Sequence, residues 1–170
     1  MKTLKRNIAI VCGGDSSEHD VSLRSAKGLY SFFDKERYNV YIVDIKRTDW
    51  HVNFNDGTTA NIDKNDFSFK NADGKTVWFD YAYITIHGTP GENGVLQGYL
   101  DLIGLPYSCC GVLAASITFN KYACNHYLKN FGFKIESCIF NSCNIYDYFC
   151  ILLFCKRIFK QQKNPSFKRS

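Results

Sequence analysis

The chain has 170 residues, of which 45% are hydrophobic and 22% are charged, and this balance excludes a disordered tail protein and a collagen-like protein. Its length predicts one domain, or one domain with an extension. Most of the formal charge of +5 belongs to the C-terminal part, because residues 1–135 hold 15 Lys/Arg and 14 Asp/Glu whereas residues 136–170 hold 6 and 2. The main part lacks the basic excess that nucleic-acid binding requires, so we expect no nucleic-acid partner.

The beginning of the chain has the pattern of alternating strands and helices. Residues 6–12 form a short apolar run rich in β-branched residues, which predicts a buried strand ending at a Gly-Gly pair. Apolar residues recur at helical spacing over residues 23–33, and a second apolar run at residues 38–45 predicts the next strand. Ser17 and Asp20, which stand three residues apart before this helix, resemble a capping box.

The middle of the chain predicts a change of architecture and then a return. Residues 50–80 contain two Asp-Gly pairs typical of hairpin turns, so we expect a β-rich insertion there. The apolar run at residues 81–86 predicts another buried strand, and the patterns at residues 96–103 and 120–131 predict helices. We therefore expect an α/β fold, a three-layer Rossmann-like domain with a parallel sheet of about four strands.

Residues 136–170 differ in composition from the rest of the chain. Cysteine supplies four of these 35 residues, Ile, Phe, Asn and Lys crowd the others, and no clean helical or strand period is visible. We interpret this tail as an atypical segment that forms no folded domain, of the kind produced when an AT-rich gene is read out of frame. The folded domain would then span residues 1–135. The alternative interpretation of the tail is a helix with a basic end.

The cysteines and the N-terminus indicate the compartment. None of the eight cysteines forms a C-x-x-C pair, and the cysteine spacing in the tail fits no common zinc pattern. The apolar run after the basic N-terminus is too short for a signal peptide, so we expect a cytoplasmic protein with reduced thiols. The apolar stretch at residues 148–155 is too short to span a bilayer, so we expect no membrane partner.

The first segment that could bind a ligand is GGDSSEHDVS at residues 13–22. Two glycines allow a tight turn at the carboxyl end of a strand, and the following helix start offers N–H groups to an anion. The dinucleotide fingerprint G-x-G-x-x-G is absent. Glu18 has two interpretations, a ligand-binding carboxylate or an acidic residue that stabilises the helix dipole. Ser16 and Ser17 are typical of helix caps rather than nucleophiles, because no base is evident beside them.

The second such segment is HGTPGENGVLQG, at residues 87–98. His87 stands where a parallel strand is predicted to end, which is the edge at which open α/β sheets bind ligands. Four glycines in twelve residues would let the backbone approach a ligand closely. A histidine at the end of a strand is often structural, but the density of glycine and polar residues around it favours a binding role.

This second segment matches, position by position, the signature H-G-x-x-G-E-(D/N)-G-x-apolar-Q-G of the D-alanine–D-alanine ligases. The opening G-G-x-S-x-E-x-x-V-S resembles the first loop of the same family, and the blocks beginning at Leu105, Gly111 and Asn120 resemble the stretch that follows. The similarity covers about residues 5–135 and then ceases. The resemblance implies the N-terminal domain of an ATP-grasp enzyme, with the pre-ATP-grasp form of the Rossmann-like fold.

The resemblance also implies an activity and roles for three residues. Ligases of this family join two D-alanines into D-alanyl-D-alanine for peptidoglycan synthesis, using ATP and Mg²⁺ or Mn²⁺, and are often homodimers. It implies that Glu18 anchors the ammonium group of the first D-alanine and so counts as a catalytic as well as a substrate-binding residue. It implies that His87 lies beside the same subsite and that Lys121 approaches the ATP phosphates. It assigns no residue of this chain to a metal ion.

The sequence departs from the family after residue 135. We find there no Lys-Pro pair, no Gly-Ser-Ser loop and none of the residues that hold the metals, and no glycine follows Gly132 to form a phosphate loop. We therefore expect a truncated chain that is inactive by itself. Two alternatives remain open: a non-catalytic α/β domain that binds a small molecule or a protein, and another ATP-grasp ligase acting on amino acids.

Overall fold

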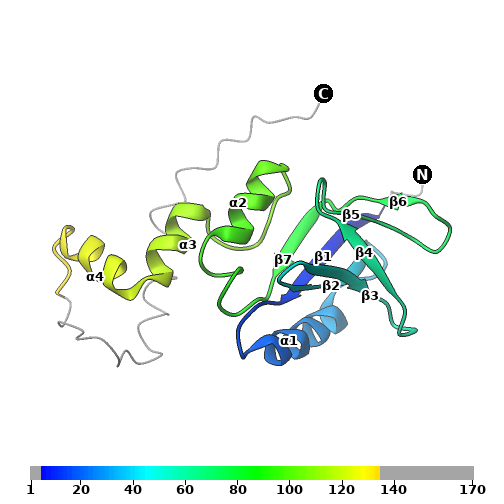
Figure 1. Cartoon of the computed structure of the whole chain (residues 1–170), viewed down its shortest axis with the longest axis horizontal. Helices are drawn as coiled ribbons and strands as arrows, with labels where there is room; N and C mark the ends of the chain where they lie inside the picture. The colour runs from blue at the N-terminus through cyan, green and yellow to red at the C-terminus, as the bar shows by residue number, and fades with distance from the viewer. Residues whose placement is uncertain (1–4, 135–170) are drawn as a thin grey trace. The chain divides into compact units, whose positions relative to one another are not determined.

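The computed structural model describes residues 5–134. The chain divides into two compact units, Met1–Ser116 and Ile117–Ser170. The first unit is built on one sheet, whose described strands follow the order β6-β5-β4-β3-β2-β1-β7 (Figure 1). The strands are β1 (Arg6–Gly13), β2 (Tyr38–Lys46), β3 (Asp49–Asn53), β4 (Thr59–Asp63), β5 (Ser68–Lys70), β6 (Thr76–Val77) and β7 (Tyr81–Ile84).

The parallel part of the sheet contains β2, β1 and β7. Strand β1 lies between the other two and pairs in parallel with both, with Ile8 opposite Val40 on one side and opposite Tyr81 on the other. Both of its neighbours are parallel because a helix or the whole insertion separates them from it in the chain. The described parallel strands number three instead of the expected four, and their carboxyl ends meet at one edge.

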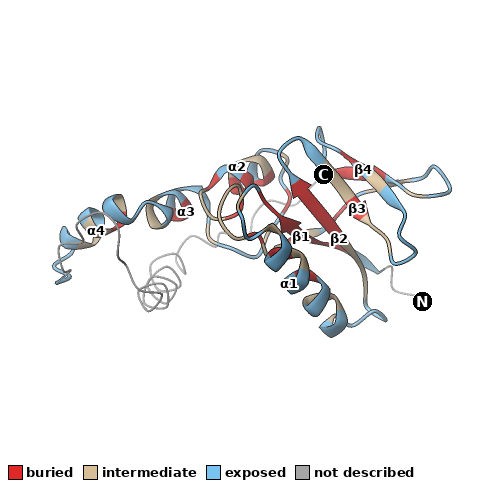
Figure 2. Ribbon diagram, turned by 60° about the horizontal axis from the view of Figure 1, so that its bottom comes forward, coloured by how far each residue is buried: buried red, intermediate tan, exposed pale blue. Residues whose placement is uncertain are grey.

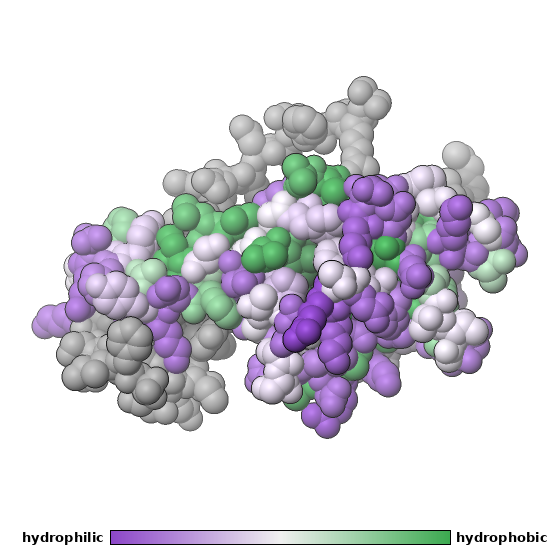
Figure 3. All heavy atoms as spheres, in the orientation of Figure 1, coloured by the Kyte–Doolittle hydropathy of each residue, from purple (hydrophilic) through white to green (hydrophobic). Residues whose placement is uncertain are grey.

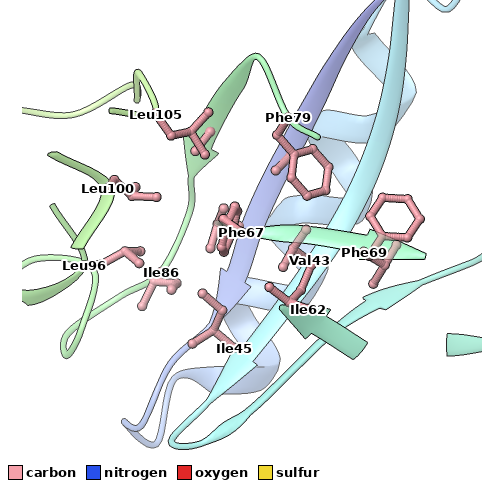
Figure 4. Close-up of a cluster of buried hydrophobic side chains, with 14 residues drawn as sticks. Val43, Ile45, Ile62, Phe67, Phe69, Phe79, Ile86, Leu96, Leu100 and Leu105 are labelled. Atoms are coloured by element: carbon pink, nitrogen blue, oxygen red, sulfur yellow. The ribbon is translucent and has the colours of Figure 1, made fainter. Parts of the chain in front are cut away.

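The β-rich insertion at residues 50–80 is confirmed, and it continues the same sheet. Each strand from β3 to β6 pairs in an antiparallel manner with the strand before it. Phe67 and Phe69 from this insertion lie in the same buried cluster as Val43 and Ile45 of β2 (Figure 4). The insertion therefore supplies part of the core of this unit.

Helices cover both faces of the parallel strands. Side chains alternate along β1, so that Ala9 and Val11 face one side while Ile10 and Cys12 face the other. The first pair packs in the cluster that includes α2 (Val95–Leu102), and the second pair packs with residues of α1 (His19–Phe32). Figure 2 shows α1 with an exposed outer side, drawn below the buried strands β1 and β2. The expected three-layer α/β class is confirmed.

Two further helices follow the sheet in the chain. They are α3 (Val112–Phe119) and α4 (Lys121–Lys129), and α4 confirms the helix expected at residues 120–131. Asn120 caps α4, because its Oδ1 accepts a hydrogen bond of 3.0 Å from the backbone N–H of Ala123. The sequence reasoning missed α3, which is apolar except for Ser116 and Thr118 and has no continuous polar face to reveal its period.

The surface of the first unit is mostly polar over the sheet and apolar in the region of α2 (Figure 3). Val95 and Leu102 of α2 are 60% and 85% exposed. Within residues 5–134, the structure contains no helix that is long and apolar enough to cross a membrane. The proposed tail at residues 136–170 lies outside the described residues, so the division at residue 135 and the out-of-frame interpretation stay predictions.

Candidate functional site at the carboxyl ends of β1, β2 and β7

The opening loop, residues 13–18, leaves β1 at the carboxyl edge of the sheet and is fastened to the end of β2. The backbone N–H of Gly14 donates to the carbonyl of Ile45 at 2.7 Å. The backbone N–H of Arg47 donates to Oδ1 of Asp15 at 2.7 Å. Gly13 has φ +93°, and a Cβ there would collide with Oδ1 of Asp44 and the carbonyl of Ile45. The Gly-Gly pair thus lets the loop lie directly against β2.

The opening loop is also joined to the second loop, residues 85–94, which follows β7. Oγ of Ser16 donates to the carbonyl of His87 at 2.9 Å, and the N–H of Asp15 donates to the carbonyl of Thr89 at 2.9 Å. Gly88 lies so close to Ser16 that a Cβ there would be 3.2 Å from the serine Cβ. Two segments 71 residues apart in the chain thus lie side by side at one edge of the sheet, as the sequence predicts.

The side chain of Ser22 connects the starts of these two loops. Its side chain is completely buried on the first turns of α1. Its Oγ accepts from the N–H of Gly13 at 3.0 Å and donates to the carbonyl of Thr85 at 2.8 Å. Both hydrogen-bonding functions of the hydroxyl are therefore used, and the ends of β1 and β7 are held at a fixed spacing.

Glu18 lies at the exposed end of the opening loop, at the N-cap position of α1. The expected capping box of Ser17 and Asp20 is wrong, because this N-cap makes no side-chain cap hydrogen bond. The loop uses Ser16 instead, whose Oγ accepts from the N–H of Glu18 at 3.2 Å. The position of Glu18 at the start of α1 suits both interpretations of its carboxylate, since the helix N-terminus stabilises a negative charge and the exposed position is open to a ligand.

His87 is half-buried at the start of the second loop, which its own side chains brace. Oε2 of Glu92 accepts from the N–H of Gly88 at 2.8 Å, and Nε2 of Gln97 donates to the carbonyl of Gly91. Gln97 is 1% exposed, and its Oε1 is the buried side-chain oxygen without a hydrogen-bond partner among the described residues. The polar residues of the signature thus fix the loop that carries His87.

Two buried groups beside the loops were missed by the sequence reasoning. Asp44, near the carboxyl end of β2, is 8% exposed and contacts His19, and the sequence signal was a charged residue inside an apolar strand pattern. Cys12 is completely buried at the end of β1, and burial, with a smaller contribution from Asp44, raises the pKa of its thiol to about 12. The Cys12 thiol therefore stays protonated at neutral pH and is no nucleophile.

Lys121 belongs to the second compact unit and is exposed at the first position of α4. Its expected approach to ATP phosphates stays a prediction. Within the described range 5–134, no group of three or more His, Cys, Asp or Glu side chains could hold a metal ion. A divalent cation therefore finds no complete ligand set in this part of the chain.

This architecture is that of an α/β domain with a candidate small-ligand site at the carboxyl edge of its parallel strands. The family model described as "D-ala D-ala ligase N-terminus" matches residues 7–110. A D-alanine–D-alanine ligase from Parabacteroides distasonis is 62% identical over 136 residues, which are 80% of this chain and 41% of that protein. One from Bacteroides fragilis is 63% identical over 133 residues, which are 78% of this chain and 41% of that protein.

A solved structure has the same fold. The crystal structure of D-alanyl-alanine synthetase A from Vibrio cholerae superposes with a TM-score of 0.70 at 29% identity, covering 94% of this chain and 46% of that one. The chain belongs to the D-alanine–D-alanine ligase family, and its matched part is the N-terminal region of that family. It spans about 41% of the length of the curated relatives that it matches.

Proposed function

We propose that this chain provides the substrate-side domain of an ATP-dependent D-alanine–D-alanine ligase, a cytoplasmic enzyme of peptidoglycan synthesis. The observation that carries the proposal is the pair of hydrogen bonds from Asp15 and Ser16 to the second loop, which brings the loops of Glu18 and His87 together. Both loops also carry the sequence patterns by which the chain resembles its family.

In this proposal Glu18 binds the ammonium group of the first D-alanine. An exposed carboxylate attached to a rigid loop is suited to this role, because a charge-assisted contact both holds and orients a small zwitterion. His87, half-buried at the start of the neighbouring loop, forms the adjacent wall of the same subsite. Orientation of the first D-alanine is then what these residues contribute to ligation, since its carboxylate must meet the phosphate donor in a fixed geometry.

ATP and the divalent cation are proposed for the complete enzyme. When bound, they would supply the phosphoryl group and neutralise the charge that develops on it. Within the described residues Lys121 is the position proposed to face the phosphates, and no residue among them is proposed as a metal ligand. The chain by itself is therefore proposed to bind D-alanine without ligating it. A homodimer is proposed for the complete enzyme on the family resemblance alone.

The test is a titration of the purified 170-residue chain with D-alanine, followed by the amide resonances of the two loops. We expect the amides of residues 13–18 and 87–91 to shift saturably, and Glu18→Gln to weaken binding at least about tenfold, because the charged partner of the ammonium group is lost. Glu36→Gln makes the same change of charge just before β2, at the opposite end of that strand, and should leave the affinity unchanged.

Two results would contradict the proposal. One is a titration in which D-alanine shifts no amide of either loop, or in which Glu18→Gln binds as well as the unaltered chain. The other is phosphate release above background when the chain receives ATP, Mg²⁺ and D-alanine, because turnover would show that the described domain does not need the rest of the family's fold.

A further inference from the structure

A buried carboxylate flanked by two histidines lies next to the opening loop and has no part in the function proposed above. Asp44 is 8% exposed at the carboxyl end of β2. Its Oδ1 is 3.1 Å from Nε2 of His19, and its Oδ2 is 3.9 Å from Nε2 of His51. The other ring nitrogen of each histidine faces an exposed carboxylate, that of Asp20 at 3.4 Å and that of Asp49 at 3.5 Å.

The contact between Asp44 and His19 is the strongest of this set. A buried carboxylate is costly unless it is paired, and the His19 ring, only 18% exposed, is the partner within hydrogen-bond distance. The backbone of Gly13 also lies against Oδ1 of Asp44, where no Cβ would fit. The carboxylate is therefore enclosed between the end of β1 and the start of α1, and it has little freedom to move.

The position of His19 makes this contact relevant to the site. His19 is the first residue of α1 and directly follows Glu18 in the chain. Gly14 and Asp15, at the beginning of the loop, make the hydrogen bonds to Ile45 at the end of β2 and to Arg47 just after it. The His19–Asp44 contact thus attaches the far end of the loop to the sheet, immediately beside the residue proposed to bind the ammonium group.

We propose that Asp44 is a positioning residue for the D-alanine subsite: it holds the His19 ring and so fixes where the backbone at Glu18 enters α1. The inference rests on the proposed function for its effect on D-alanine binding, but not for its effect on the loop. Asp44 touches no substrate in this scheme. Its influence passes through His19, and His51 on its other oxygen is too distant to replace that contact.

A matched pair of variants at His19 separates positioning from side-chain bulk. The amide Nε2 of glutamine can donate to Asp44 from nearly the place of the imidazole Nε2, so His19→Gln should retain D-alanine affinity within about twofold. His19→Leu retains bulk but has no donor, and it should weaken D-alanine binding by about tenfold, because the loop loses its attachment. Equal affinities of His19→Leu and the unaltered chain would overturn the inference.

A double-mutant cycle tests whether Asp44 acts through His19. Asp44→Ala should weaken binding about as much as His19→Leu, and adding it to His19→Leu should cause almost no further loss, because the two residues form one contact. Additive losses would overturn the inference. The amide spectrum shows whether each variant is folded, and if Asp44→Ala does not fold, the His19 pair still decides the matter.

The backbone amide of Glu18 provides a readout that needs no ligand. Its resonance should move in His19→Leu and stay near its original position in His19→Gln, whether or not D-alanine binds. If the unaltered chain binds no D-alanine, the proposed function fails while this comparison still tests the positioning role. An unmoved Glu18 amide in His19→Leu would overturn the inference by itself.

Discussion

Ser22 shows how much one buried hydroxyl contributes to the arrangement of the site. It accepts from the N–H of Gly13 and donates to the carbonyl of Thr85, so that it joins the ends of β1 and β7. Removing it would leave a donor and an acceptor unpaired in a buried position. We expect Ser22→Ala to lower the free energy of unfolding by about 1–3 kcal/mol, measured by urea denaturation.

Ser25 is the matched control for this prediction. It lies on the same helix, but it is exposed, and its Oγ donates only to the carbonyl of Val21 one turn earlier. Ser25→Ala should therefore change the free energy of unfolding by less than about 0.5 kcal/mol. Equal effects of the two substitutions would show that the bridge between the strands contributes no stability.

Cys12 makes the stability of the domain sensitive to alkaline pH. The pKa of its thiol is raised from 9.0 to about 12 in the folded state, mainly by burial. Above pH 9 the unfolded state therefore binds fewer protons than the folded state, and stability falls as the pH rises towards 12. The slope contributed by this thiol approaches about 1.4 kcal/mol per pH unit.

Urea denaturation of Cys12→Ala between pH 9 and 10 checks this expectation. The variant should be less stable at pH 7 because it leaves a cavity, but its stability should decline less steeply with pH than that of the unaltered chain. The window ends at pH 10 because Tyr99, whose pKa burial raises to about 12, adds its own slope above that pH. Identical slopes for the two proteins would contradict the assignment to Cys12.

At the scale of elements, the loop after β7 depends on a glycine where a side chain would not fit. A Cβ at Gly91 would be 2.5 Å from Cβ of Ile86 and 3.0 Å from its carbonyl oxygen. Gly91→Ala should therefore overpack the loop and lower the free energy of unfolding by about 1–3 kcal/mol. The measurement is thermal unfolding, read together with the amide shift of His87, which should move because the loop must shift.

Gly28 gives the opposite expectation for the same substitution. It is exposed in the middle of α1, and a Cβ there would meet nothing within 4 Å. Gly28→Ala should raise stability by about 0.5–1 kcal/mol through the helix propensity of alanine. A loss of stability at both positions would indicate that crowding around Gly91 is not the cause of its effect.

The elements and the neighbouring loops were largely predictable, because their signals are local. Periodic apolar residues indicated β1, α1, β2 and β7, and parallel strands place their carboxyl ends at one edge, so that Glu18 and His87 could be expected on adjacent loops. The helix α3 could not be found in this way, since Val112–Phe119 has no continuous polar face. The contacts of Ser16 and Ser22 also could not, because their partners are backbone carbonyls more than 60 residues away.

At the scale of the whole molecule, the sequence did not show how the insertion joins the sheet. Asp-Gly pairs correctly indicated hairpins, but no local pattern shows that β3 joins the end of β2 and that β3–β6 extend its sheet. That outcome depends on Phe67 and Phe69 finding the apolar face of β2, which is a contact between distant segments. The roles of Glu18 and His87 stay proposals that the D-alanine titrations described above will decide, and the role of Lys121 stays a proposal.

The central place of β1 has a consequence for the order of events on the ribosome. Its partner on one side begins at Tyr38, but its partner on the other side begins only at Tyr81. The nascent chain can thus pair β1 with β2 and form the hairpins of the insertion before β7 has been synthesised. Pairing near segments is also favoured because pairing distant ones costs more chain entropy. The β7 side of the sheet, which leads into the second loop of the proposed D-alanine subsite, is therefore the last part of the sheet to be completed. A nascent chain halted before residue 81 would leave one side of β1 without a paired strand.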